Sequence, residues 1–138
     1  MTVLFPDIEP IVVSFFSSAI SASTETVLDG VRVGTKKLSE EYEVASEVVI
    51  TANYGSTVNK VLRNATVTVD VYSDSYSKAS NIATLLTAFS PNIVGEQIKF
   101  AEVSVGPIRV AESSTKERRA FTLDLAVKGV DYEDPANP

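Results

Sequence analysis

The chain has 138 residues, of which 44% are hydrophobic and 22% are charged, so its size and composition are those of one folded domain. It contains neither cysteine nor histidine, which excludes disulfides, thiol nucleophiles, imidazole bases and Cys/His metal sites. Its net charge of −6 argues against specific nucleic-acid binding, because phosphate backbones attract basic surfaces. Its longest apolar run is too short to cross a bilayer and no basic signal-peptide segment opens the chain, so we expect synthesis in the cytoplasm and no membrane partner.

The first predicted element is a helix that begins after Asp7. Its apolar residues recur three and four positions apart, which is the spacing of one helix face: Ile8, Ile11, Val12, Phe15, Phe16 and Ala19. Asp7 is suited to cap the free amides, and Pro10 falls in the first turn, where its missing donor costs little. The polar stretch that leads to Gly30 predicts the exit loop.

Three strands are predicted in the next part of the chain. Residues 31–33 and 48–50 are short β-branched segments, whereas residues 66–72 alternate strictly between valine and polar residues. We expect the last of these strands to be half-buried and to pair antiparallel with the one before it. The charged residues 36–47 predict a loop, or an arm that becomes ordered only when it contacts a partner. Residues 53–56 are of types that favour a turn.

A second helix and two further strands are predicted in the last third of the chain. Residues 73–75 offer capping side chains before an apolar helical face, which ends at the proline-containing residues 90–92. A bent strand follows, with a bulge expected near Ala101 or Glu102 and an interruption at Gly106-Pro107. A polar loop over 112–119 then leads to residues 121–127, whose strict alternation predicts a strand with one wet face.

The order of these elements favours an α+β fold. We expect a single domain over residues 1–130, built as a mainly antiparallel, twisted β-sheet with two principal helices packed on one face. Residues 131–138 are acidic and contain two prolines, so we expect a flexible C-terminal tail.

Charged residues in two segments form the candidate interface with other subunits. Lys36 and Lys37 stand close in sequence to a run of glutamates, which gives opposite charges that would pair between identical copies in a head-to-tail ring. Arg118 and Arg119 end the polar loop, where they form either a solvated hairpin tip or a docking finger. The candidate interface residues are therefore Arg32, Lys36, Lys37, Glu40, Glu41, Glu43, Arg118 and Arg119.

Four segments, in this order, resemble the tail terminator proteins of long-tailed bacteriophages. They are Phe5-Pro6-Asp7 before an apolar helix, Val31-Arg32-Val33-Gly34-Thr35, the strand over 67–72 that feeds a helix, and the closing strand over 121–127. The resemblance covers residues 5–131, and the order and spacing of the segments carry it. The charged stretch over 36–47 and the acidic tail depart from the family pattern.

This resemblance implies a structural virion protein rather than an enzyme, with no catalytic residue, cofactor or metal. It implies an α+β subunit that forms a sixfold ring on the head-proximal end of the tail tube, stops tube growth and presents a surface for the head. The implied partners are further copies of the chain, the tail tube protein and a head-completion or connector protein. Genomic DNA would pass through the acidic lumen without specific binding. The implied location is the tail or neck of the virion, assembled in the cytoplasm of the bacterial host.

Two alternatives stay open. One is another component of the neck or tail, such as a head-completion protein or a tube subunit. The other is a small carboxylate-dependent enzyme or metal-binding module that uses Asp70 and Asp124. These residues lie on the polar faces of two predicted strands, and adjacent pairing of the strands would bring the carboxylates together as acid and base or as metal ligands.

Overall fold

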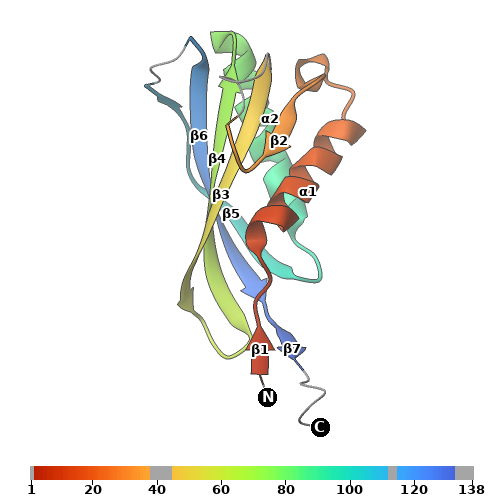
Figure 1. Ribbon diagram of the computed structural model, residues 1–138, viewed down its shortest axis with the longest axis vertical. Helices are drawn as coiled ribbons and strands as arrows, with labels where there is room; N and C mark the ends of the chain where they lie inside the picture. Colours follow the sequence, from red (N-terminus) through yellow and green to blue (C-terminus); the bar gives the residue numbers. More distant parts are fainter. Residues whose placement is uncertain (1, 38–44, 112–114, 133–138) are drawn as a thin grey trace.

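Two helices lie on the same face of a five-stranded sheet in the computed structural model, which describes residues 2–37, 45–111 and 115–132 (Figure 1). The helices are α1 (Ile8–Ala22) and α2 (Tyr76–Phe89). The strand order in the sheet is β2 (Arg32–Gly34), β3 (Ser46–Thr57), β4 (Leu62–Ser73), β6 (Glu117–Lys128) and β5 (Ile98–Val110). Only β2 and β3 are parallel; the other three pairings are antiparallel. The predicted α+β class is confirmed.

Both helices begin where their capping residues predict. The Asp7 side chain accepts a hydrogen bond from the Glu9 amide at the start of α1, and the Ser75 hydroxyl accepts one from the Lys78 amide at the start of α2. Their buried residues follow the helical period: Ile8, Val12 and Phe16 in α1, and Ala79, Ile82, Ala83 and Leu86 in α2. Two short 3₁₀ helices, η1 (Thr26–Leu28) and η2 (Ser90–Ile93), follow α1 and α2.

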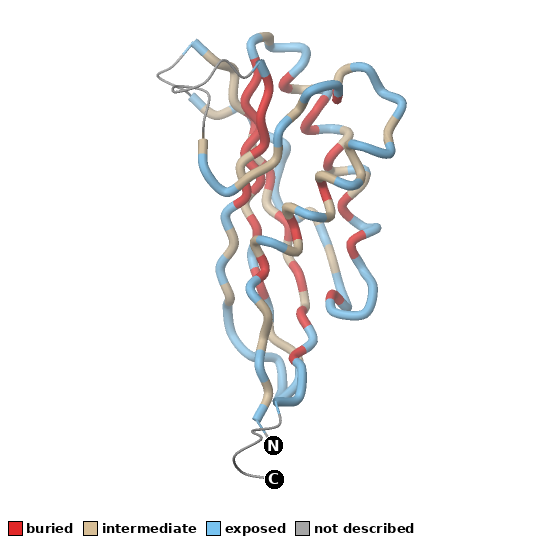
Figure 2. The backbone as a smooth tube through the Cα atoms, turned by 45° about the vertical axis from the view of Figure 1, so that its right-hand side comes forward, coloured by how far each residue is buried: buried red, intermediate tan, exposed pale blue. Residues whose placement is uncertain are grey.

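The core lies between the helices and one face of the sheet, which we call the helix face. Strands β4 and β6 supply alternate buried residues to it, namely Ala65, Val67, Val69 and Val71 in β4, and Phe121, Leu123, Leu125 and Val127 in β6. Figure 2 shows the buried segments gathered along the strands beneath the helices. The predicted antiparallel pairing of β3 with β4 is confirmed. We call the opposite side of the sheet the open face.

Residues 53–56 do not form the predicted turn, because β3 continues through them to Thr57. Pairing with β4 holds this segment extended, with Tyr54 opposite Ala65. The turn comes later, at Asn59, whose side chain accepts hydrogen bonds from the amides of Val61 and Leu62 at 2.9 Å each. Pairing between β3 and β4 therefore keeps residues 53–56 extended, although their residue types favour a turn.

Strand β5 is irregular at the predicted Gly106-Pro107, but not at Ala101 and Glu102. Its ladder with β6 is regular from Ala101 to Val103, so the bulge expected near Ala101 or Glu102 is wrong. The register shifts instead between Ile98 and Phe100, and again on both sides of Val105. The last shift contains Gly106-Pro107, where Gly106 has a φ of +85° and a Cβ atom would lie 2.6 Å from the Ala120 carbonyl oxygen.

A second, two-stranded sheet ties the two ends of the described chain together. Strand β1 (Thr2–Leu4) pairs antiparallel with β7 (Val130–Tyr132), close to the hairpin between β3 and β4 (Figure 1). Residues 131 and 132 thus belong to a strand, and the flexible tail predicted from residue 131 is wrong for these two positions. Residues 133–138 lie outside the described residues. Backbone pairing with β1 supplies the order that the acidic sequence alone does not predict.

Candidate interface

The predicted cations Arg32, Lys36 and Lys37 lie at the β2 edge of the sheet. Arg32 is exposed on β2 opposite Glu47, and Lys36 is exposed just after the strand. Lys37 follows at the open face, where its ammonium lies 4.6 Å from the centre of the Tyr72 ring. Arg32 and Lys36 are therefore available for a contact, whereas Lys37 already has a structural role.

The predicted acidic half of this interface is Glu40, Glu41 and Glu43. These glutamates lie outside the described residues. Their pairing with the cations of another copy stays a prediction.

Arg118 and Arg119 do not stand at a hairpin tip, because β6 begins at Glu117 and includes both of them. Arg118 lies on the open face, where its Nε and Nη2 atoms are 2.9 and 2.8 Å from Asp70 Oδ1. Arg119 lies on the helix face, buried over the Tyr76 ring at 4.5 Å and 3.7 Å from a Glu117 carboxylate oxygen. The long β4–β6 ladder pairs them with Tyr72 and Val71, so neither belongs to the polar loop in which they were expected. Their contact with another subunit stays a prediction.

Asp70 and Asp124 lie on the open face of adjacent strands, but the register keeps their carboxylates apart. Asp70 is opposite Ala120 and Asp124 is opposite Thr66. Four residues along a strand therefore separate the two, which is about 13 Å. Asp70 is also already paired with Arg118, so the predicted meeting of two carboxylates is wrong. Among the described residues, no three side chains of His, Cys, Asp or Glu gather where they would hold a metal ion.

An exposed apolar row on β5 was not predicted from the sequence. Phe100, Val105 and Ile108 are 49%, 50% and 51% exposed. Their partners on β6 are Ala126, Thr122 and Ala120, which places all three on the open face at the edge of the sheet. The register shifts between them break the alternation that would have shown a common face.

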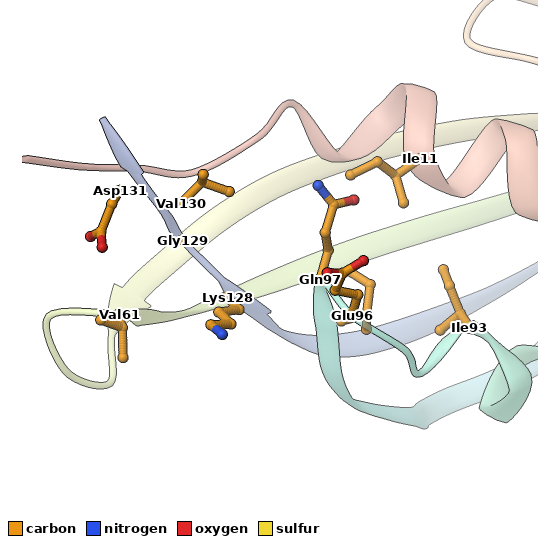
Figure 3. A pocket seen from close by; sticks show the side chains of 10 residues that line it. Ile11, Val61, Ile93, Glu96, Gln97, Lys128, Gly129, Val130 and Asp131 are labelled. Carbon is orange, nitrogen blue, oxygen red and sulfur yellow. The ribbon is translucent and has the colours of Figure 1, made fainter. Parts of the chain in front are cut away.

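A groove of about 730 Å³ is the second feature that sequence reasoning missed. It lies beside β7, between the first half of α1 and the loop from η2 to β5 (Figure 3). Its lining residues come from five separate segments and are Ile11, Val61, Ile93, Glu96, Gln97, Ile98, Lys128, Gly129, Val130 and Asp131. Further exposed apolar residues at this end of the molecule are Leu4, Val58 and Tyr132.

The sequence matches no protein-family model and no curated protein. Within the described ranges, neither helix combines the length and apolar character that crossing a bilayer requires. The support for a function therefore comes from the exposed strand edges, the apolar row and the charges of the structure.

Proposed function

We propose that this chain is a structural subunit that assembles head to tail into a closed ring and acts as a tail terminator of a long-tailed bacteriophage. In this role the ring caps the head-proximal end of the tail tube, stops its polymerisation and offers a surface for the head. The observation that carries the proposal is the row of Phe100, Val105 and Ile108, half-exposed on an edge strand. A long apolar edge strand is a surface that a stable protein covers with a partner.

The sheet has a second edge that is able to receive β5 of another copy. Strand β2 pairs only with residues 47–49 of β3, so within the described chain the rest of β3 has no strand on that side. Each step from β3 through β4 and β6 to β5 reverses direction, so β5 runs opposite to β3. Rotating one copy beside the next therefore places β5 antiparallel to β3.

This geometry favours a ring over a two-fold dimer. A head-to-tail contact uses two different surfaces of each subunit, and repeated rotation closes it into a ring. Arg32 and Lys36 are exposed at the receiving edge, and the sequence places Glu40, Glu41 and Glu43 shortly after them. Opposite charges between copies would fix the register of the contact.

The terminator role rests on the sequence resemblance together with the fold. The α+β architecture agrees with what the resemblance implies, and a ring that ends a tube needs two distinct axial faces. The termini and the β3–β4 hairpin lie at one end of the sheet, and the end of β4 and the start of β6 lie at the other (Figure 1). The two axial faces of a ring would therefore differ in structure.

The assembly is tested by absolute mass from light scattering across a concentration series, with negative-stain images of the same fractions. We expect the wild-type chain to form closed rings of about six copies. The double variant Val105→Lys with Ile108→Lys should remain monomeric, because two ammonium groups would enter the contact. Val94→Lys is the single-charge control, since Val94 is 49% exposed at the end of η2. A wild-type monomer at every concentration, or rings that survive the double substitution, would overturn the proposed contact.

The biological role needs a second measurement, in which the chain is added to polymerising tail tube protein. A terminator limits the length of the tubes, and the ring-deficient double variant should not. Tube polymers formed by this chain alone would assign it instead to the tube. Rings that leave tube length unchanged would point to another position in the neck.

A further inference from the structure

We infer that the groove beside β7 binds an extended segment of another protein by strand addition, and that this segment carries an aliphatic residue next to a cationic one. The inference does not depend on the ring. It joins three properties of the groove: isoleucines in its walls, a side of β7 that no described strand pairs with, and two exposed carboxylates among its lining residues.

The cleft is the right size and character for aliphatic side chains. Ile11 from α1, Ile93 from η2 and Ile98 from β5 line it from three different elements. Figure 3 shows the first two pointing toward one another across the groove. Ile93 and Ile98 are 8% and 2% exposed, so they form packed walls rather than mobile surface groups. A volume of about 730 Å³ is typical of a preformed binding cleft.

The strand edge supplies the means of backbone recognition. Strand β1 occupies one side of β7, and no strand in the described part of the chain occupies the other. Val130 and Asp131 line the groove, so β7 borders the cleft. Two-stranded sheets are marginal in water, and a third strand stabilises them. An incoming segment would therefore gain backbone hydrogen bonds from β7 while alternate side chains enter the cleft.

The charges at the groove select the partner. Glu96 and Asp131 are exposed, and neither forms an ion pair with another described residue, whereas Lys128 is the one cation among the lining residues. A second copy of β7 is a poor occupant, because two-fold antiparallel pairing about its middle residue would set Asp131 against Asp131. The lining residues thus carry one more carboxylate than cations. A cationic side chain of the partner, next to its aliphatic one, would pair with that carboxylate.

The test uses fluorescence anisotropy to measure how tightly the full-length chain binds a fluorescein-labelled peptide in which valine alternates with lysine. The matched peptide has glutamate in place of lysine. We expect the lysine peptide to bind at least about tenfold more tightly. In the double variant Glu96→Lys with Asp131→Lys this preference should reverse. The double variant Glu102→Lys with Asp124→Lys makes the same change in net charge on the open face and should keep the wild-type preference.

Backbone amide shifts in an NMR titration show where the peptide binds. The expected shifts lie in β7 and the loop from η2 to β5, because the peptide extends the β1–β7 sheet. Equal affinity for both peptides, no binding up to about 1 mM, or equal loss of preference in the two double variants would overturn the inference. Shifts centred on the open face would do the same. Circular dichroism establishes that each variant is folded, which is expected because Glu96, Asp131 and Glu102 are exposed and Asp124 is on the open face.

Discussion

The two ends of the sheet differ in what covers them. At the end beneath the helices, both faces of the central strand β4 are packed: the helix face carries the core, and on the open face Asp70 and Tyr72 are each only 7% exposed. At the end that holds the termini, Val58 is 56% exposed and Val130 is 54% exposed. The comparison teaches that stability is concentrated at the covered end, while the terminal end keeps apolar surface available to a partner.

The polar groups at the covered end explain how the open face is closed there. The Tyr72 ring lies 4.6 Å from the Lys37 ammonium and 5.5 Å from the Arg118 guanidinium, and Arg118 also pairs with Asp70. On the helix face the hydroxyls of Ser46 and Ser73 form a buried hydrogen bond of 2.9 Å. Each buried polar group named here has a partner, as burial requires.

The largest effect should come from removing a core side chain at the covered end. Phe121 is 1% exposed, and Phe121→Ala should lower the free energy of unfolding by about 3–5 kcal/mol, because it leaves a cavity beneath the helices. Val58→Ala at the terminal end should change it by less than about 0.5 kcal/mol. Urea denaturation measures both. Similar losses for the two variants would contradict the division between the ends.

The covered end also contains what the sequence predicts best. Caps at Asp7 and Ser75, the apolar helix faces and the alternation in β4 and β6 are local patterns, and each was confirmed. The register of the β4–β6 ladder is not local. Because the ladder extends to Glu117, Arg118 and Arg119 belong to β6 and not to the preceding loop. The register also keeps Asp70 away from Asp124.

The terminal end was predicted less well, because its structure depends on contacts between distant segments. Pairing with β4 extends β3 through residues 53–56, and pairing with β1 orders residues 131 and 132. The groove draws its walls from five segments, none of which carries a recognisable motif. The apolar row on β5 was hidden by register shifts that only the structure reveals.

The second largest effect should come from the ion pair on the open face of the covered end. The Asp70 side chain is 10% exposed, accepts a hydrogen bond from Arg118 Nε and forms an ion pair with Arg118 Nη2, so Asp70→Asn should cost about 1.5–3 kcal/mol of folding stability. Asp124→Asn lies on the same face without an ion pair and should be nearly neutral. A double-mutant cycle with Arg118→Met measures the coupling. A coupling near zero would show that the pair does not stabilise this end.

A smaller and more local effect is expected at Gly129, where β6 leads into β7. A Cβ atom there would clash with Val3 Cγ1 and would lie 3.3 Å from the Leu4 carbonyl oxygen. Gly129→Ala should therefore separate β1 from β7 at a cost of about 1–2 kcal/mol. Hydrogen exchange should quicken at the β1 and β7 amides and stay slow in β4 and β6. Gly95→Ala, whose added Cβ would be 3.9 Å from the nearest atom, is the control. Uniform acceleration along the chain would mean that the two ends unfold as one unit.

The smallest effect concerns Tyr54, which connects the terminal end to the main sheet. Its hydroxyl donates a hydrogen bond to the Pro6 carbonyl oxygen, and its ring packs edge-on against Phe5 at 5.9 Å. Tyr54→Phe should cost about 1 kcal/mol at neutral pH, because the Pro6 oxygen loses its donor. Tyr132→Phe removes a hydroxyl from an exposed ring and should be silent.

The same tyrosine makes the link between the two regions dependent on pH. Burial raises the pKa of Tyr54 above its ordinary value of 10.0, with the Asp7 carboxylate adding to the effect and Arg63 opposing it. The folded state thus holds the phenolic proton more tightly than the unfolded state does. The stability that this group contributes is complete below pH 10 and is lost as the pH rises through the raised pKa. Urea titrations at about pH 9 and pH 11 should therefore show a steeper loss in the wild type than in Tyr54→Phe. Equal losses of stability in the two proteins would mean that the Tyr54 proton does not stabilise the contact between the terminal end and the main sheet.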